Sequence, residues 1–283
     1  MSANPPALPE RIGAHAHPAW LYRHPRCLRL VFGWYRLLYQ RTWVTQRALN
    51  RALRRLPAGS KVLDAGCGEG LFLFRTARRF PQHRFVGGDV RPANLRLAGN
   101  FLSRSSLRNV RLAPMDLADL SSIPVAHLIY MVGVLHLLPD DRAALHHLRR
   151  RVEAGGRLLL YTPVHRRRVL PWFEAWYRRF ANYEATHAQR VYTPAALCGL
   201  LRDSGWHIQS ERYTNGTLGI IGYELYTGFF LLISAGNTGQ RLLGLLLLII
   251  TLPLILALNG LDYLRRPERG NGVLITAVAA PVD

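Results

Sequence analysis

Short apolar runs alternate with stretches of helical spacing through the middle of the chain. The short runs are typical of buried strands and lie at residues 61–65, 84–90, 110–117, 126–132 and 157–162. The helical patterns lie between them, near residues 70–80, 92–103 and 143–152, the last of them ended by Gly155-Gly156. Because strands that alternate with helices form parallel sheets, the pattern predicts an α/β, doubly wound fold.

The same alternation continues toward the C-terminus and is then interrupted. Residues 192–204 have the pattern of a helix that begins at Thr193-Pro194, and residues 206–213 have the pattern of a strand. A further strand is predicted at residues 272–278. The intervening stretch is far longer than a normal turn, so we interpret residues 215–269 as an insertion.

Two apolar runs dominate the insertion. Residues 218–234 carry one charge, Glu224, and residues 242–261 carry none but include Pro253. A helix as long as the second run spans about 30 Å, the thickness of the hydrocarbon core of a membrane. Residues 236–239 form a turn signal between the runs. The pattern predicts a membrane-associating helical hairpin, with a buried soluble hairpin or an oligomer interface as alternatives.

Topology limits how such an insertion can meet a membrane. If the strands on either side of it belong to one sheet, both of its ends lie on one side of the membrane. The insertion then crosses twice, dips in and returns, or lies flat in the interface. Glu224 and Pro253 favour a shallow hairpin over two full spans. Arginines flank the second run and are expected at anionic headgroups on the cytoplasmic side: Arg241, Arg265, Arg266 and Arg269.

The N-terminal part of the chain divides into two stretches. Residues 1–19 are rich in Pro and Ala and are expected to be poorly ordered, and residues 1–11 lack the apolar core of a signal peptide. Residues 20–56 have a helical pattern in which aromatic residues interleave with arginines. That mixture suits the membrane–water interface, and it equally suits a helix that covers the sheet or a cofactor. A Pro-Ala-Gly-Ser break follows at residues 57–60.

Composition adds an extreme positive charge. The chain has 37 Lys and Arg residues against 17 Asp and Glu residues, a formal net charge of +20, and Lys61 is its single lysine. Such a balance favours anionic membranes or nucleic acid as partners, although a general bias toward arginine would produce it as well. A hydrophobic content of 49% excludes a disordered chain.

The cysteines predict neither disulfides nor a metal site. The three residues, Cys27, Cys67 and Cys198, are odd in number, far apart and without paired spacing. A reducing compartment is therefore expected, and no metal is predicted.

A glycine turn follows the first strand. Gly66, Gly68 and Gly70 separate this strand from the next helical pattern, a geometry that brings backbone amides close to a nucleotide-like ligand. Asp64 stands just before the first glycine. A carboxylate there would repel a pyrophosphate and suits a positively charged ligand. S-adenosylmethionine carries an ammonium and a sulfonium group and no phosphate.

The stretch Val-Leu-Asp-Ala-Gly-Cys-Gly-Glu-Gly resembles motif I of the class I S-adenosylmethionine-dependent methyltransferases. Three further stretches match in order, so the resemblance covers about residues 60–164. It implies a Rossmann-like sheet of seven strands, with the last strand antiparallel and inserted between the fifth and sixth. It also implies a cofactor site made of Asp64, Gly66, Gly68, Asp89, Val90, Asp116, Leu117 and Met131.

The resemblance assigns parts of the cofactor to these residues. Asp64 and the two glycines would hold the amino-acid end. Asp89 ends the second predicted strand, where a ribose diol is bound in Rossmann-like sites, and Val90 would pack near the adenine. Asp116 and Leu117 would hold the adenine. Met131 would lie at the exit of the fourth strand.

The acceptor side departs from the family pattern. His127 stands where an acid is common, and residues 165–183 follow no general pattern. His136 is the best candidate to face the acceptor, as a base or a hydrogen-bond partner, although a histidine is frequent near this position without acting as a base. Position alone suggests further pocket residues: Tyr183, Glu184, His187 and Tyr223. A structural role is expected for Cys67.

These patterns together predict three regions. Residues 1–57 form a disordered start and basic aromatic helices, residues 58–214 with 270–283 form the methyltransferase domain, and residues 215–269 form the insertion. The expected function is methyl transfer to a lipophilic small-molecule or lipid-like acceptor at the cytoplasmic face of the membrane. An RNA methyltransferase is the alternative, but residues 131–134 lack the Asn/Asp-Pro-Pro-aromatic motif of base-amino enzymes. A non-catalytic cofactor-binding scaffold is a third possibility.

Overall fold

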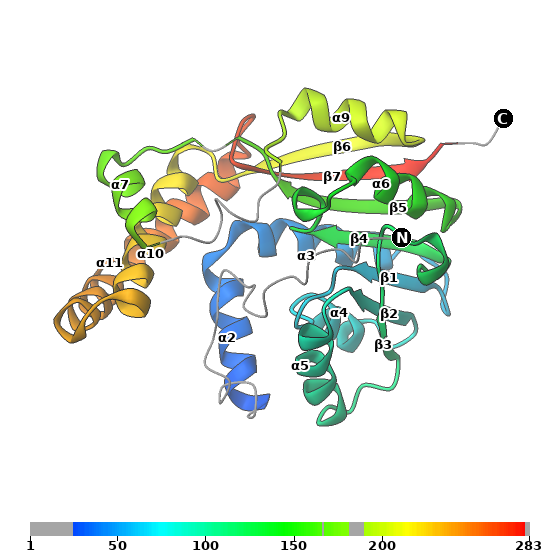
Figure 1. Cartoon of the computed structure of the whole chain (residues 1–283), viewed down its shortest axis with the longest axis horizontal. Coiled ribbons are helices and arrows are strands. Elements are labelled where there is room, and N and C mark those ends of the chain that lie inside the picture. Colours follow the sequence, from blue (N-terminus) through cyan, green and yellow to red (C-terminus); the bar gives the residue numbers. More distant parts are fainter. Residues whose placement is uncertain (1–24, 166, 181–189, 281–283) are drawn as a thin grey trace, which may run out of the picture.

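A seven-stranded sheet forms the centre of the protein, in the strand order β3-β2-β1-β4-β5-β7-β6 (Figure 1). The computed structural model describes residues 25–165, 167–180 and 190–280. The pairings among β1 to β5 are parallel, whereas β7 runs antiparallel to both β5 and β6. The predicted fold, with its antiparallel last strand between β5 and β6, is confirmed. The strands are β1 (Lys61–Ala65), β2 (Arg84–Asp89), β3 (Val110–Pro114), β4 (Ala126–Val132), β5 (Val152–Pro163), β6 (Trp206–Thr214) and β7 (Gly272–Ala279).

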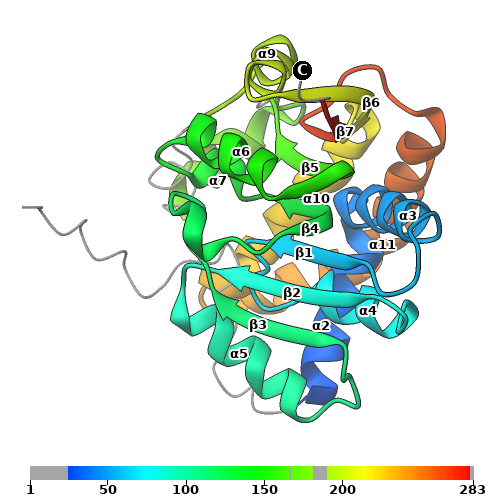
Figure 2. The same ribbon diagram turned by 90° about the vertical axis from the view of Figure 1, so that its right-hand side faces the viewer.

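Helices cover both faces of the sheet (Figure 2). On one face, α3 (Gln40–Leu53), α4 (Leu73–Arg79) and α5 (Pro92–Ser103) pack against strand residues such as Val62 and Leu128. On the other face, α6 (Asp141–Arg150) and α9 (Pro194–Asp203) pack against residues such as Leu63 and Ile129. Neighbouring residues of β1 and β4 thus point into two different cores, as the pleat of a strand requires.

The start of β5 differs from the prediction. The helix predicted over residues 143–152 begins earlier, because the Asp140 side chain accepts a hydrogen bond from the Ala143 amide at 2.8 Å. It ends at Arg150, and β5 already begins at Val152. Gly155 and Gly156 therefore lie inside the strand, where the register with β4 shifts, and do not end the helix. A Cβ atom at Gly156 would lie 2.9 Å from the His127 carbonyl oxygen, so this irregular strand needs glycine there.

The N-terminal segment forms two helices, α2 (Pro25–Leu38) and α3, within the described residues. Leu49 and Leu53 of α3 are fully buried under the sheet, so α3 has the covering role that was one of the two alternatives. In α2, Leu30 is 74% exposed. The predictions for residues 1–19 and for Trp20 to His24 lie outside the described residues.

The insertion is a helical hairpin of α10 (Thr217–Ala235) and α11 (Thr238–Arg265), which pack against each other and project from the sheet (Figure 1). Asn237 caps α11 through a reciprocal pair of hydrogen bonds with Gln240. Both ends of the insertion return to one sheet, because Thr214 of β6 pairs with Gly272 of β7. By length and composition alone, α11 could cross a membrane.

A buried polar junction fixes the root of the hairpin to α3. The Gln40 amide donates to Asp262 Oδ2 and to the Asn259 carbonyl, both at 3.1 Å, and its oxygen accepts from the Asn215 amide at 2.9 Å. Asp262 also accepts from the Gly216 amide at 2.9 Å. Since buried polar groups need these partners, removal of the whole hairpin would leave Gln40 unsatisfied. Point substitutions therefore test the hairpin better than a deletion.

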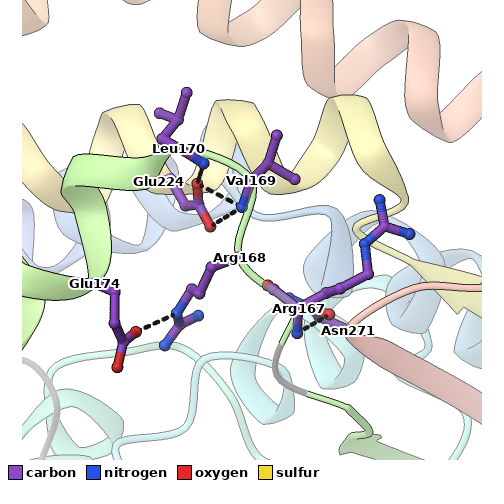
Figure 3. Close-up of polar contacts among 7 residues, drawn as sticks. All are labelled: Arg167, Arg168, Val169, Leu170, Glu174, Glu224 and Asn271. Carbon is purple, nitrogen blue, oxygen red and sulfur yellow. Dashed lines mark hydrogen bonds and ion pairs between the residues drawn. The ribbon is translucent and has the colours of Figure 1, made fainter.

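Glu224 connects α10 to the segment that follows β5 (Figure 3). Its side chain is fully buried and accepts hydrogen bonds from the Val169 amide at 3.0 Å and the Leu170 amide at 2.7 Å. These amides immediately precede α7 (Pro171–Phe180), so the carboxylate satisfies donors at the start of that helix. The charge faces the protein, which removes Glu224 as an argument for a shallow hairpin.

We expect Glu224→Ala to loosen the segment from Val164 to Phe180. Two partly buried amides would lose a charged acceptor, at a cost of about 3 kcal/mol. Hydrogen-exchange mass spectrometry should show faster exchange of this segment than in the wild type. Glu268→Ala, at an exposed position, is the control. Equal exchange in the two variants would show that Glu224 does not hold the segment.

Candidate functional site

The glycine turn lies at the C-terminal end of β1 and has the backbone that only glycine adopts easily. Gly66, Gly68 and Gly70 have φ values of 82°, 53° and 88°. A Cβ atom at Gly66 would lie 2.4 Å from Val134 Cγ2, whereas one at Gly68 would meet no atom within 4 Å. Gly66 is thus required for close packing against the exit of β4. Gly68 faces open space, where a ligand can approach the backbone.

Asp64 is a buried carboxylate beside this turn. Its residue is 3% exposed and pairs in register with Tyr130 of β4. The pKa of Asp64 is raised to about 8, because burial and, to a smaller extent, the charge of Asp89 outweigh the opposite effect of the Tyr130 hydroxyl. None of the described residues forms an ion pair with Asp64. A buried carboxylate without a protein cation fits a ligand that brings its own positive charge.

Asp89 links β2 to the glycine turn. One carboxylate oxygen accepts from the Gly68 amide and the other from the Arg91 amide, each at 2.9 Å. A carboxylate offers about four acceptor positions, so Asp89 can still bind two hydroxyl groups. Val90, which follows it, is 55% exposed and can cover an aromatic ring. Asp89 therefore holds the glycine turn in place. Its remaining acceptor positions are available for the predicted ribose contact.

The remaining predicted cofactor residues differ in accessibility. Asp116 is exposed, and its Oδ1 atom accepts from the Ala118 amide at 2.9 Å. Leu117 and Met131 are 5% and 0% exposed, with side chains in the core under α6 and α9. They can support the site from beneath, and Leu117 can offer a ligand little more than its main chain.

Two of the acceptor-side candidates lie within the described residues, His136 after β4 and Tyr223 in α10. His136 is half-buried in the short helix Leu135–Leu137. Tyr223 of α10 has its ring 6.5 Å from that of Tyr39, at the junction of α2 and α3. The candidates Tyr183, Glu184 and His187 lie outside the described residues.

Two further residues define the chemistry of the turn. Burial and the neighbouring charges of Asp64 and Asp89 raise the pKa of the Cys67 thiol far above its usual value, so the thiol stays protonated, in keeping with a structural role. Tyr130 was not singled out from the sequence. The available signal was a polar hydroxyl in the apolar run of β4, which pairs with the strand that carries Asp64. The described residues contain no cluster of three or more potential metal ligands.

A protein-family model for a methyltransferase domain matches residues 37–211. The chain belongs to this methyltransferase family. Together with the seven-stranded sheet, the match identifies a class I enzyme that uses S-adenosylmethionine. The matched residues include the glycine turn, Asp64 and Asp89, and they end before the hairpin.

Known relatives of this methyltransferase include enzymes named for small organic acids. The trans-aconitate 2-methyltransferase of Deinococcus radiodurans is 32% identical over 155 residues, which cover 52% of this chain and 58% of that protein. The aklanonic acid methyltransferase DauC of a Streptomyces species is 32% identical over 117 residues, 40% of this chain and 53% of that protein. The chain thus spans little more than half the length of these relatives.

A solved structure supports the fold. The geranyl diphosphate C-methyltransferase of Streptomyces coelicolor, in complex with S-adenosylhomocysteine, aligns with a TM-score of 0.55 at 16% identity. The alignment covers 84% of this chain and 76% of that chain.

The residues of this methyltransferase fit its cofactor. Asp64 offers a buried carboxyl group that can ionise to meet the ammonium group, Asp89 offers free acceptor positions for a diol, and Gly68 leaves room for close approach. The cofactor supplies an electrophilic methyl group. The chain's own task is to hold both partners in line and to exclude water.

We expect cofactor affinity to rise about tenfold between pH 6 and pH 7. With a pKa of about 8, Asp64 is largely protonated in this range, and an ammonium ligand requires it to ionise. Each pH unit below the pKa therefore weakens binding about tenfold. Isothermal titration calorimetry in two buffers of different ionisation enthalpy would measure both the affinity and the released proton. Affinity that does not change over this range would show that Asp64 is already charged.

Proposed function

We propose that this methyltransferase acts on a lipophilic small-molecule or lipid-like acceptor while the α10–α11 hairpin holds it on the cytoplasmic face of the membrane. The observation that carries the proposal is the outer face of α11. Its large apolar side chains are 47% to 74% exposed: Leu242, Leu243, Leu245, Leu246, Ile249, Ile250, Leu254, Leu261 and Leu264. At 1.5 Å per residue this face is about 33 Å long. So large an apolar surface is unusual in a soluble monomer.

The polarity of α11 is reversed relative to a helix on a soluble protein. Asn259 and Asp262 are 2% and 4% exposed and face the protein, whereas nine leucines and isoleucines face outward. Gly244 also lies inside, where a Cβ atom would be 2.7 Å from Leu232 of α10. Small and polar residues at the helix contact and apolar residues outside are features of helices in lipid.

The position of the hairpin suits delivery of an apolar acceptor. β6 and β5 run in the same direction, because each is antiparallel to β7. The hairpin therefore leaves the end of β6 at the same edge of the sheet as the glycine turn after β1. An acceptor dissolved in the membrane would reach this edge without crossing water.

The relatives support a small-molecule acceptor, since two of them are named for trans-aconitate and aklanonic acid. RNA is the competing acceptor, favoured by the net charge of +20. Charge alone gives non-specific RNA binding in any basic protein. It offers no explanation for the outer face of α11.

A transfer assay distinguishes the acceptors. The protein would be incubated with S-adenosylmethionine labelled in its methyl group and, in parallel, with total membrane lipid extract or total RNA. We expect label in the organic phase of the lipid reaction. Label that enters RNA alone would overturn the proposal. Asp64→Asn, which should not bind the cofactor, is the inactive control, and unchanged cellular function in that variant would indicate a scaffold.

A further inference from the structure

A basic hollow of about 640 Å³ lies between α3 and its neighbours α2 and α4. Five arginines contribute to its lining: Arg36, Arg47, Arg51, Arg54 and Arg75. We call it the α3 arginine hollow. Gln46 and Asn50 add amide groups, and its lining contains no Asp or Glu. It is thus built from hydrogen-bond donors and positive charge.

The arginines of the hollow lack acidic partners. Among the residues that the structure describes, none of the five forms an ion pair. Burial lowers the pKa of Arg36, and the like charge of Arg75 lowers it further. Arginines so placed repel one another, and an anion bound between them would relieve this repulsion.

The positive surface continues on the other flank of α3. A second hollow, of about 340 Å³, shares Arg47 and Arg51 with the first and adds Arg55, Arg157 and Arg212. Burial lowers the pKa of Arg212, and the charges of Arg266, Arg47 and Arg51 act in the same direction against an opposing effect of Tyr263. The exposed side of α3 is therefore a continuous anion-attracting surface.

This surface meets the root of the hairpin through Tyr263 of α11. Arg47 donates to the Tyr263 hydroxyl at 3.3 Å, and Arg212 donates to the Tyr263 carbonyl at 3.0 Å. The Trp43 ring, in the wall of the hollow, packs edge-on against Tyr263 with centroids 5.5 Å apart. The apolar face of α11 ends next to this residue, at Leu264. The apolar face of α11, the Trp43–Tyr263 pair and the arginines thus follow one another along the protein. A membrane has the matching order of lipid tails, interface and headgroups.

We propose that the α3 arginine hollow binds the phosphate-bearing headgroup of an anionic phospholipid. The planar guanidinium groups form paired hydrogen bonds with phosphate oxygens, and the side-chain nitrogen of Asn50 adds a donor. Gln46 orients that amide, because its own nitrogen donates to Asn50 Oδ1 at 3.1 Å. The phosphate site itself does not depend on the proposed function. The assignment of that phosphate to a lipid headgroup rests on the proposed membrane contact. A bound headgroup would fix how the enzyme sits on the membrane, beyond the contact that α11 alone provides.

Two vesicle experiments test the site. Binding of the full chain to phosphatidylcholine vesicles containing phosphatidic acid would be compared for the wild type, Arg51→Gln/Arg54→Gln and Arg108→Gln/Arg111→Gln. Arg111 is exposed in β3, an edge strand of the sheet, and Arg108 is exposed just before it. Neither residue lines the hollow, and the control pair removes the same charge. At about 1 kcal/mol per arginine, the hollow pair should lower the partition coefficient about thirtyfold. The control pair should lower it much less, and equal losses would overturn the proposal.

A soluble probe separates this site from the hairpin. Dibutanoyl phosphatidic acid, which forms no membrane, should bind the wild type in calorimetry and should bind Arg51→Gln/Arg54→Gln at least tenfold more weakly. Dibutanoyl phosphatidylcholine should bind neither. If vesicle binding by α11 fails while the soluble probe still binds, the membrane proposal fails and the phosphate site stands. If inorganic phosphate competes equally well, or an RNA oligonucleotide alone depends on the two arginines, the lipid assignment is overturned.

Discussion

Asp64→Asn is expected to stabilise the cofactor-free protein and to abolish useful cofactor binding. The folded state raises the pKa of Asp64 from 3.8 to about 8. The folded protein thus retains a proton that the unfolded chain has lost. The contribution of this proton to stability is fully present below pH 3.8 and is lost as pH rises through 8. At pH 7 the raised pKa of Asp64 therefore lowers the free energy of unfolding by up to about 4 kcal/mol. Asparagine has the same shape and no charge to bury.

The same substitution removes the charge that would face the cofactor's ammonium group. Loss of one partner of a buried ion pair costs about 3 kcal/mol or more, which is over a hundredfold in dissociation constant. Thermal unfolding at pH 7 and calorimetry with S-adenosylmethionine measure the two effects. Asp203→Asn, at an exposed ion pair with Arg142, should change neither quantity. A lower melting temperature with unchanged affinity would make Asp64 a structural acceptor and would remove it from the cofactor site.

Leu246→Glu with Ile250→Glu is expected to release the protein from membranes. These side chains are 55% and 63% exposed on the outer face of α11, so the fold should tolerate both changes. In lipid, each exchange of an apolar for an acidic residue costs about 3 kcal/mol. Together they should lower partitioning into phosphatidylcholine–phosphatidylglycerol vesicles more than about a thousandfold. Vesicle flotation measures this, with circular dichroism to confirm folding.

Val125→Glu with Val191→Glu provides the matched control. Both valines are exposed, at 36% and 52%, and neither belongs to the hairpin. The control adds the same negative charge and should keep vesicle binding. Light scattering should be measured for each protein, because a wild-type dimer that becomes monomeric only in the α11 variant would identify an oligomer interface. Unchanged flotation of the α11 variant would exclude this face as the membrane contact.

Sequence pattern determined most of the scaffold. β1, β4 and α5 occur within the predicted limits, since each is a strongly patterned run with clear breaks at its ends. The glycine turn with Asp64 and Asp89 was equally visible, because close approach of a backbone requires glycine at fixed positions. The start of β5 could not be predicted from the sequence, because the Gly-Gly pair that suggests a helix end also suits an irregular strand.

The tertiary structure decided the meaning of the insertion's polar residues. From the sequence, Glu224 was a charge in an apolar run, whereas in the fold it binds the amides before α7. Asp262 likewise turns inward and accepts from Gln40, and the Asn259 side chain donates to the Leu38 carbonyl, both of which lie far away in the sequence. Helical periodicity cannot show which face of a nearly all-apolar helix meets the protein. Packing against α10 and α2 buried Leu248 and Ile255 and left the exposed row from Leu242 to Leu264 outside.

The sequence by itself determined the cofactor, the α/β fold and the presence of an apolar hairpin, because these depend on local patterns. Only the tertiary structure placed the α3 arginine hollow beside the root of that hairpin. The arginines of α3 repeat along one helix, but Arg75, Arg212 and Tyr263 come from distant segments. Their contact depends on how the hairpin packs on α3, a long-range arrangement that no local pattern encodes.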